Sequence, residues 1–151
     1  MILSWQEAVE WRKTVQGTLV FTNGVFDILH RGHIDYLLQA RKLGDALIVG
    51  VNSDASARML NKGPRRPFNK QEDRALLLSQ LKPVDAVVIF DQPTPAELIE
   101  LIQPDIVVKG GDYKPEEVVG KDTVEKRGGK VEIIPITLGY STSSLVENIR
   151  L

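Results

Sequence analysis

Apolar runs separated by amphipathic stretches divide this chain into alternating elements. Five of the runs are short, rich in β-branched and aromatic residues and apolar without alternation, which is typical of strands covered on both faces. They predict strands at 18–23, 46–52, 86–90, 106–108 and 131–134. Between them, apolar spacing and start and stop residues predict helices after Ser4, before Gly44, over 54–60, from Asn69 to about Leu81, from Thr94, before Gly128 and from Ser141 to about Arg150.

Three helix starts carry capping patterns, one of them at Thr94, which is followed by Pro95 at the first helical position and by Glu97 three residues after the cap. Ser4 with Glu7 has the spacing of a capping box, and Asn69 with Glu72 has the same spacing. We expect two helices to turn clusters of apolar residues inward, namely Ile34, Leu37 and Leu38 in one and Leu76, Leu77, Leu78 and Leu81 in the other.

The alternation of strands and helices predicts an α/β fold with a doubly wound, five-stranded parallel sheet of the Rossmann-like type. A length of 151 residues suits one domain with one core, so we expect residues 1–151 to form a single domain. Sheets of this kind bind ligands at the carboxyl ends of their strands, where the strand order reverses. The predicted fold therefore indicates where a site should lie.

Composition narrows the function classes. Hydrophobic residues make up 42% of the chain, and no apolar run approaches the roughly 20 residues of a membrane-spanning helix. The first residues do not have the pattern of a signal peptide, and there is no cysteine for disulfides or thiolate chemistry. The net charge of −1 argues against nucleic acid as a partner. We expect a soluble, cytoplasmic domain.

Polar and glycine-rich residues gather after three of the predicted strands, at 23–33, 109–113 and 139–144. A glycine after a strand lets backbone N–H groups approach a phosphate, and a helix that begins there adds further donors and a positive dipole end. The three segments therefore predict a phosphate-binding site at the carboxyl edge of the sheet.

His30 and His33 are the two histidines of the chain, and Gly32 lies between them. An isolated pair of this kind is ordinarily one structural and one surface histidine. A zinc site is disfavoured, because zinc usually takes three or four protein ligands and the chain has no cysteine or third histidine. In a third interpretation both imidazoles donate hydrogen bonds to phosphate oxygens at a helix N-terminus, which accounts for the glycine and the preceding strand.

The segment His30-Arg31-Gly32-His33, preceded by Gly24-Val25-Phe26-Asp27, resembles the H-x-G-H signature of the cytidylyltransferase-like nucleotidyltransferase superfamily. The run at 141–144 is similar to the second signature of that superfamily, and Gly110-Gly111-Asp112 follows the fourth strand as it does there. The similarity spans roughly residues 18–150. It implies an enzyme that joins a nucleoside monophosphate from an NTP to a phosphorylated substrate and releases pyrophosphate.

Within the superfamily, the stretches 66–69, 72–74, 107–117 and 139–142 look like those of bacterial heptose 1-phosphate adenylyltransferases in a stand-alone form. That resemblance implies transfer of AMP from ATP to D-glycero-beta-D-manno-heptose 1-phosphate, giving the ADP-heptose used for lipopolysaccharide core biosynthesis. Ile136 stands where glycerol-phosphate and choline-phosphate cytidylyltransferases have an arginine. A glycerol-3-phosphate-type cytidylyltransferase and a nucleotide-binding regulatory module without catalysis are the alternatives.

The resemblance also implies roles for individual residues. His30 and His33 would contact the triphosphate in catalysis, and Lys62, on a basic loop with Arg65 and Arg66, would contact the substrate phosphate. Asp27 would orient its loop or a metal. The implied nucleotide-binding set is Asn23, Gly24, Val25, Phe26, Asp27, His30, His33, Arg74, Gly110, Gly111, Asp112, Ser141, Thr142 and Ser143.

Several of these residues have ordinary structural interpretations as well. Basic loops are usually solvated surface, and Arg74 alone would be taken as a surface charge. Serine and threonine at 141–143 suit an N-cap, and Gly110 and Gly111 suit a tight turn. Mg²⁺ is implied as the counterion of ATP, without protein ligands that the sequence identifies, and a homodimer is implied by small members of the superfamily.

Overall fold

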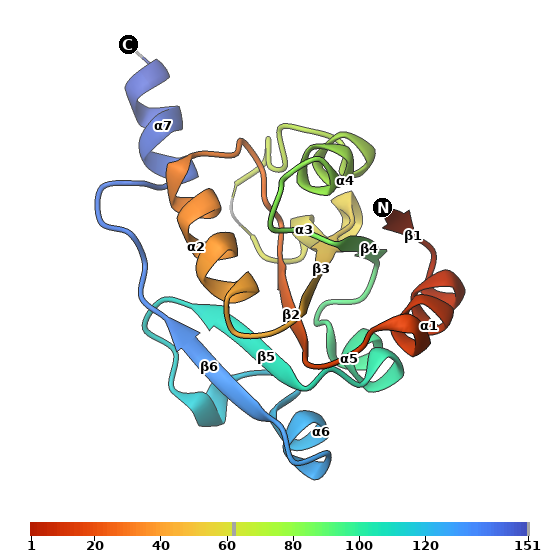
Figure 1. Cartoon of the computed structure of the whole chain (residues 1–151). Coiled ribbons are helices and arrows are strands. Elements are labelled where there is room, and N and C mark those ends of the chain that lie inside the picture. The colour runs from red at the N-terminus through yellow and green to blue at the C-terminus, as the bar shows by residue number, and fades with distance from the viewer. Residues whose placement is uncertain (62, 151) are drawn as a thin grey trace.

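A parallel sheet forms the centre of the computed structural model, which describes residues 1–61 and 63–150 (Figure 1). Its strands lie in the order β1-β4-β3-β2-β5-β6, and every neighbouring pair is parallel. The strands are β1 (Ile2–Leu3), β2 (Leu19–Gly24), β3 (Ala46–Asn52), β4 (Ala86–Phe90), β5 (Ile106–Gly110) and β6 (Lys130–Ile134). The predicted α/β fold with a parallel sheet is confirmed.

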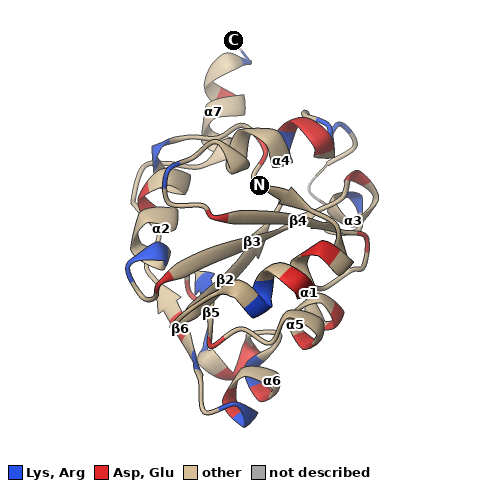
Figure 2. Cartoon of the chain, turned by 45° about the vertical axis from the view of Figure 1, so that its right-hand side comes forward, with Lys and Arg blue, Asp and Glu red and all other residues tan. Residues whose placement is uncertain are grey.

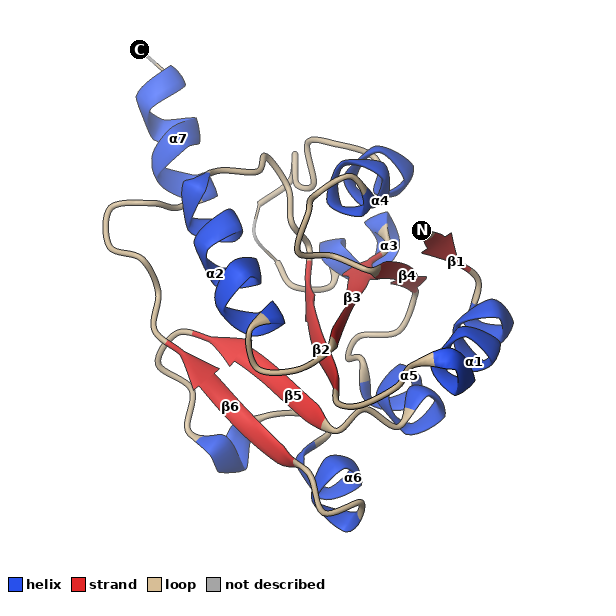
Figure 3. Ribbon diagram, viewed as in Figure 1, coloured by secondary structure: helices blue, strands red, loops and turns tan. Residues whose placement is uncertain are grey.

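Helices cover both faces of this sheet, as the ribbon diagram shows (Figure 3). They are α1 (Trp5–Thr14), α2 (Arg31–Arg41), α3 (Asp54–Arg58), α4 (Gln71–Ser79), α5 (Ala96–Ile102), α6 (Lys121–Lys126) and α7 (Thr142–Ile149), with a 3₁₀ turn at Pro115–Glu117. Adjacent residues of one strand point to opposite faces of the sheet and pack into different hydrophobic clusters. Phe21 packs with α1, α5 and α6, whereas Val20 packs with α2 and α4. This two-sided burial explains why the strands are apolar runs.

The strand order reverses next to β2. From β2 the chain moves outward through β3 and β4 on one side, and β5 then returns to pair with the other edge of β2. The loops that leave the carboxyl ends of β2 and β5 therefore diverge onto opposite faces, which opens a crevice between them. The first two polar segments predicted from the sequence, at 23–33 and 109–113, leave the sheet at this reversal.

A sixth strand, β1, was missing from the five-strand prediction. It has two residues, Ile2 and Leu3, which pair with Val87 and Val88 of β4 at the edge of the sheet. Two residues carry no periodicity, so the strand had no sequence signal. The capping box that follows it is confirmed, since the backbone N–H of Glu7 donates to Ser4 Oγ over 3.1 Å and the Ser4 N–H donates to the Glu7 carboxylate over 2.9 Å.

Part of the predicted inward packing is wrong. Leu37 and Leu78 are fully buried, but Leu38 is 40% exposed, and Leu76 and Leu77 are 52% and 50% exposed. Three consecutive leucines in α4 cannot all face one side of a helix, since successive residues are about 100° apart. Helix α4 also begins at Gln71 rather than at a capping Asn69.

Acidic and basic residues are interspersed along the helices and loops, in keeping with the small net charge (Figure 2). Helices α1 and α6 each carry both signs, and ion pairs such as Lys13–Glu10 and Lys121–Glu125 lie along them. Within residues 1–61 and 63–150, no helix is long and apolar enough to cross a membrane.

Candidate functional site

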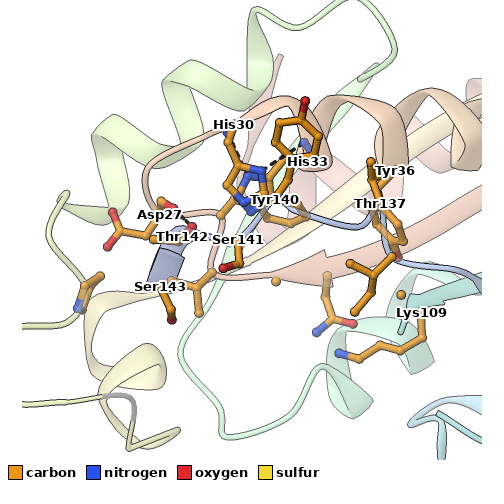
Figure 4. A pocket seen from close by; sticks show the side chains of 18 of the residues that line it. Asp27, His30, His33, Tyr36, Lys109, Thr137, Tyr140, Ser141, Thr142 and Ser143 are labelled. Carbon is orange, nitrogen blue, oxygen red and sulfur yellow. Dashed lines mark hydrogen bonds between the residues drawn. The ribbon is translucent and has the colours of Figure 1, made fainter. Parts of the chain in front are cut away.

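A cleft of about 670 Å³ opens at the carboxyl edge of the sheet, at the reversal beside β2. Residues from the loops after β2, β5 and β6 line it together, as does the start of α7 (Figure 4). His30 and His33 lie in its middle in this view, with Asp27, Thr142 and Ser143 toward one end and Lys109 and Thr137 toward the other. The three glycine-rich segments of the sequence therefore meet in one cavity.

The two histidines form the N-terminal cap of α2. The backbone N–H of Gly32 donates to His30 Nδ1 over 3.0 Å, and the backbone N–H of His30 donates to His33 Nδ1 over 3.2 Å. The pair thus makes a capping box in which imidazoles replace the usual hydroxyl and carboxylate. The two ring centroids are 3.9 Å apart.

This cap fixes the tautomer of both rings. An Nδ1 that accepts a backbone N–H cannot carry a proton, so each neutral imidazole carries its proton on Nε2. Burial disfavours the charged form and lowers the pKa of His30 below its usual 6.5. At neutral pH, therefore, His30 is a neutral Nε2–H donor at the start of a helix.

Gly32 permits the close approach that this cap requires. A Cβ atom at this position would lie 2.8 Å from His30 Cε1 and 3.0 Å from the Cβ of Tyr140. Any larger residue would therefore push the His30 ring or the segment before α7 away. Gly32 therefore has a packing role, because it lets the start of α2 and the Tyr140 segment approach each other closely.

We expect nuclear magnetic resonance to find the Nε2–H tautomer for both histidines and a pKa below 6.5 for His30. Because folding lowers this pKa, the unfolded chain binds more protons than the folded chain at pH values between the lowered pKa and 6.5. The contribution of His30 to stability is then complete above pH 6.5 and is lost as the pH falls through the lowered value. Long-range ¹H–¹⁵N spectra across a pH titration measure both quantities, and an Nδ1–H tautomer at neutral pH would contradict the cap geometry.

Helix α7 begins beside the loop that precedes α2 (Figure 1). Ser141 is its N-cap, and its Oγ accepts the backbone N–H of Ser144 over 3.0 Å. Thr142 Oγ1 donates to the backbone carbonyl of Asp27 over 2.8 Å, so the start of α7 is tied to the loop before α2. Two helix N-termini therefore border one cavity, and backbone donors with positive dipole ends attract anions.

Asp27 holds the loop before α4 in place. Its nearly buried carboxylate accepts the backbone N–H of Phe68 over 2.6 Å and both the backbone and side-chain N–H groups of Asn69 over 3.0 Å. The neighbours Phe26 and Ile28 have positive φ angles of 53° and 51°, which are costly for residues other than glycine. Asp27 therefore joins three segments around the cleft, which supports the predicted orienting role.

Arg74, expected to contact the nucleotide, does not line the cleft. Its guanidinium is completely buried and donates to the carbonyl oxygens of Val25, Asn52 and Asn69 and to the carboxylate of Asp54, over 2.7–2.9 Å. Its burial contradicts the interpretation of Arg74 as a simple surface charge. The geometry assigns it the support of the loops that form the cleft.

Most of the other predicted residues come together in the cavity. Those that line it are Asn23, Gly24, Val25, Phe26, Asp27, His30, His33, Gly110, Ser141, Thr142 and Ser143. Gly111, which has a φ of 102°, and Asp112 do not line it. Lys62 lies outside the described residues.

The structure adds lining residues beyond that set, chiefly Tyr36, Arg66, Lys109, Tyr113, Ile136, Thr137 and Tyr140. Tyr36 is on α2, and its hydroxyl lies 2.6 Å from Thr22 Oγ1 and donates to the carbonyl of Val108. Burial raises the pKa of its phenol, which stays protonated. Tyr36 falls one turn after His33, and that helical spacing was the signal in the sequence.

The acidic and histidine side chains of the described residues do not gather into a metal site. No group of three or more His, Asp and Glu side chains could hold a cation among residues 1–61 and 63–150. The Asp27 carboxylate in the cleft is already bonded to three N–H donors. The described side chains therefore provide no preformed set of three or more ligands for a cation.

Comparison with known proteins identifies the family of this chain. Residues 21–148 match the family described as Cytidylyltransferase-like. The chain is 53% identical over 146 residues to bifunctional protein HldE of Syntrophotalea carbinolica, covering 97% of this chain and 30% of that protein. It is 57% identical over 132 residues to HldE of a Nitratiruptor species, covering 87% of this chain and 28% of that protein. The chain thus spans about 30% of the length of these curated relatives.

Solved structures show the same relationship. A lipopolysaccharide core biosynthesis protein from Thermoplasma volcanium superposes with a TM-score of 0.67 at 36% identity, over 81% of this chain and 98% of that one. A pantoate–beta-alanine ligase from Francisella tularensis, at 15% identity and a TM-score of 0.65 over 100% of this chain and 73% of that one, shares the fold alone. The matched residues include both histidines and the start of α7. The chain therefore belongs to the cytidylyltransferase-like family of nucleotidyltransferases.

Proposed function

We propose that the chain is an adenylyltransferase that transfers AMP from ATP to D-glycero-beta-D-manno-heptose 1-phosphate, giving ADP-heptose and pyrophosphate. The observation that carries the nucleotidyl transfer is the cap of α2, which directs two neutral Nε2–H imidazoles to a cleft that also contains the start of α7. Support for the heptose substrate comes from the resemblance of 107–117 and 139–142 to heptose enzymes and from the lipopolysaccharide core protein that shares 36% of its residues.

The chemistry suits these groups. An oxygen of the sugar phosphate attacks the α-phosphorus of ATP and forms a new P–O bond, while the bond from the α-phosphorus to the α–β bridging oxygen breaks. Pyrophosphate leaves with that oxygen and its electron pair. A phosphate monoester is already a nucleophile at neutral pH, so the site needs no strong base. It accelerates the reaction by positioning the reactants and stabilising the charge that develops.

Each group of residues around the cleft then has a role in the reaction. The Nε2–H groups of His30 and His33 donate to the phosphate oxygens whose charge grows in the transition state. The start of α7, with Ser141 and Ser143, holds the two outer phosphates. Asp27 holds the loop before α4 in place by accepting three N–H groups from Phe68 and Asn69.

The remaining assignments belong to the same proposal. Lys62 contacts the sugar phosphate. ATP enters as its magnesium complex, so Mg²⁺ belongs to the substrate and no step is assigned to a metal held by the protein. The reaction takes place in the cytoplasm, where ATP is available, and the chain acts as a homodimer.

A glycerol-3-phosphate-type cytidylyltransferase is the second candidate, and one observation opposes it. Ile136 lines the cleft, with 62% of its side chain exposed, where that class has an arginine. An isoleucine cannot supply the paired N–H donors by which a guanidinium grips a phosphate.

Pyrophosphate release tests the proposal directly. The purified chain is given ATP or CTP, each with magnesium, together with the heptose 1-phosphate or glycerol 3-phosphate. We expect turnover with ATP and the heptose phosphate alone. Turnover of CTP with glycerol phosphate would reverse the choice of substrates, and a folded chain that turns over no pair would leave a binding module without catalysis.

A further inference from the structure

The cleft has an arginine, Arg66, to which the sequence analysis assigned no contact of its own. Arg66 lies on the loop before α4, and its Nη2 donates to Ser143 Oγ, on the first turn of α7, over 3.4 Å. This contact joins residues that are 77 positions apart and reaches across the cleft. A guanidinium therefore lies beside the helix start that holds the outer phosphates in the proposed function.

The surrounding contacts position this side chain. Its guanidinium lies over the Phe68 ring, 5.0 Å from the centroid, and the backbone of Phe68 is fixed by its hydrogen bond to Asp27. Stacking on an aromatic ring orients the planar guanidinium and leaves its N–H edge available. Arg66 is thus held at the mouth of the cleft by an anchored residue.

The charge of Arg66 is also available for an anion. Ion pairs with carboxylates occupy Arg12, Arg31, Arg41, Arg74 and Arg127. Arg66 makes no such ion pair within residues 1–61 and 63–150. The adjacent Arg65 is exposed and does not line the cleft.

We propose that Arg66 binds the β- and γ-phosphates of the nucleotide and stabilises the departing pyrophosphate, a role that rests on the proposed nucleotidyl transfer. As the α-phosphorus–oxygen bond breaks, negative charge grows on the leaving oxygen and the outer phosphates, and a guanidinium that donates to them lowers the barrier.

The test compares Arg66→Gln with Arg65→Gln, which removes the same charge one residue away. Isothermal titration calorimetry gives the affinity of each variant for inorganic pyrophosphate, ATP and AMP. Arg66→Gln is expected to weaken pyrophosphate and ATP binding by about 10- to 100-fold, the range of a charge-assisted hydrogen bond. AMP, which lacks the outer phosphates, should bind as to the wild type, and Arg65→Gln should leave all three unchanged. In turnover, Arg66→Lys should recover part of the activity lost in Arg66→Gln.

The other outcomes are decisive as well. Equal losses for ATP and AMP would place Arg66 away from the outer phosphates and overturn the inference. So would unchanged pyrophosphate binding, for instance if Arg66→Gln raised only the KM of the sugar phosphate. The pyrophosphate-binding measurement uses no sugar. A wrong heptose assignment would therefore change the turnover result and leave the binding result unaffected. A wild-type chain that does not bind pyrophosphate would overturn both.

Discussion

Replacing His30 or His33 by alanine is expected to lower turnover by about 10²-fold or more, the usual cost of removing one transition-state donor. In the structure Nδ1 of each imidazole accepts a backbone N–H in the cap of α2, and in the proposed function the Nε2–H group donates to the substrate. An alanine removes both functions. Steady-state pyrophosphate release measures the loss, and circular dichroism confirms that the variants fold.

Asparagine separates the two functions. Its side-chain oxygen caps helices as well as any residue and can replace Nδ1, but it cannot reach the position of Nε2. His30→Asn should therefore keep the stability of the wild type and lose nearly as much activity as His30→Ala. If either alanine variant loses less than about tenfold in activity while its fold is intact, the proposed catalytic role of that histidine is wrong.

Arg74→Met is expected to lower the free energy of unfolding by about 3–5 kcal/mol, as does breaking a buried ion pair. The guanidinium is fully buried, and its loss leaves the Asp54 carboxylate and three backbone carbonyls without their donor. Methionine has a similar length and is apolar, so the change removes hydrogen bonds with little loss of volume. Urea denaturation measures the difference.

Arg127→Met is the matched control, because the Arg127–Asp105 pair, at 3.4 Å, has side chains that are 38% and 29% exposed. Pairs of this kind contribute about 1 kcal/mol or less. If Arg74 instead binds the nucleotide directly, Arg74→Met would keep the stability of the wild type and raise the KM for ATP. That result would contradict the structural role.

The strands were the part of the fold that the sequence predicted best, because full burial leaves unbroken apolar runs. The ranges 46–52 and 86–90 agree with β3 and β4 residue for residue. The errors arose in segments whose hydrophobic residues showed no periodicity. The leucines of α4 are adjacent, so their composition could not indicate which one faces the core, and β1 is two residues long.

The part of the site that could be predicted is the part whose polar residues lie together in one short segment. His30 and His33 share a helix turn with Gly32, and the sequence displays their spacing directly. Arg66 and Ser143 meet only because two distant loops fold onto the same cleft, and no local spacing predicts that contact. The burial of Arg74 was hidden for the same reason, since its carbonyl acceptors come from three separate segments.

The two walls of the cleft differ in how firmly they belong to the body of the protein. Below the cleft, β2 and β3 are largely buried, whereas α7 has no buried residue and projects from the fold (Figure 1). Thr142 holds its first turn through hydrogen bonds to the carbonyl oxygens of Asp27 and Ile28. Local opening costs least where few apolar contacts must be broken. The start of α7 can therefore open locally while the sheet remains folded, and under the proposed function this opening would give pyrophosphate a route out of the cleft.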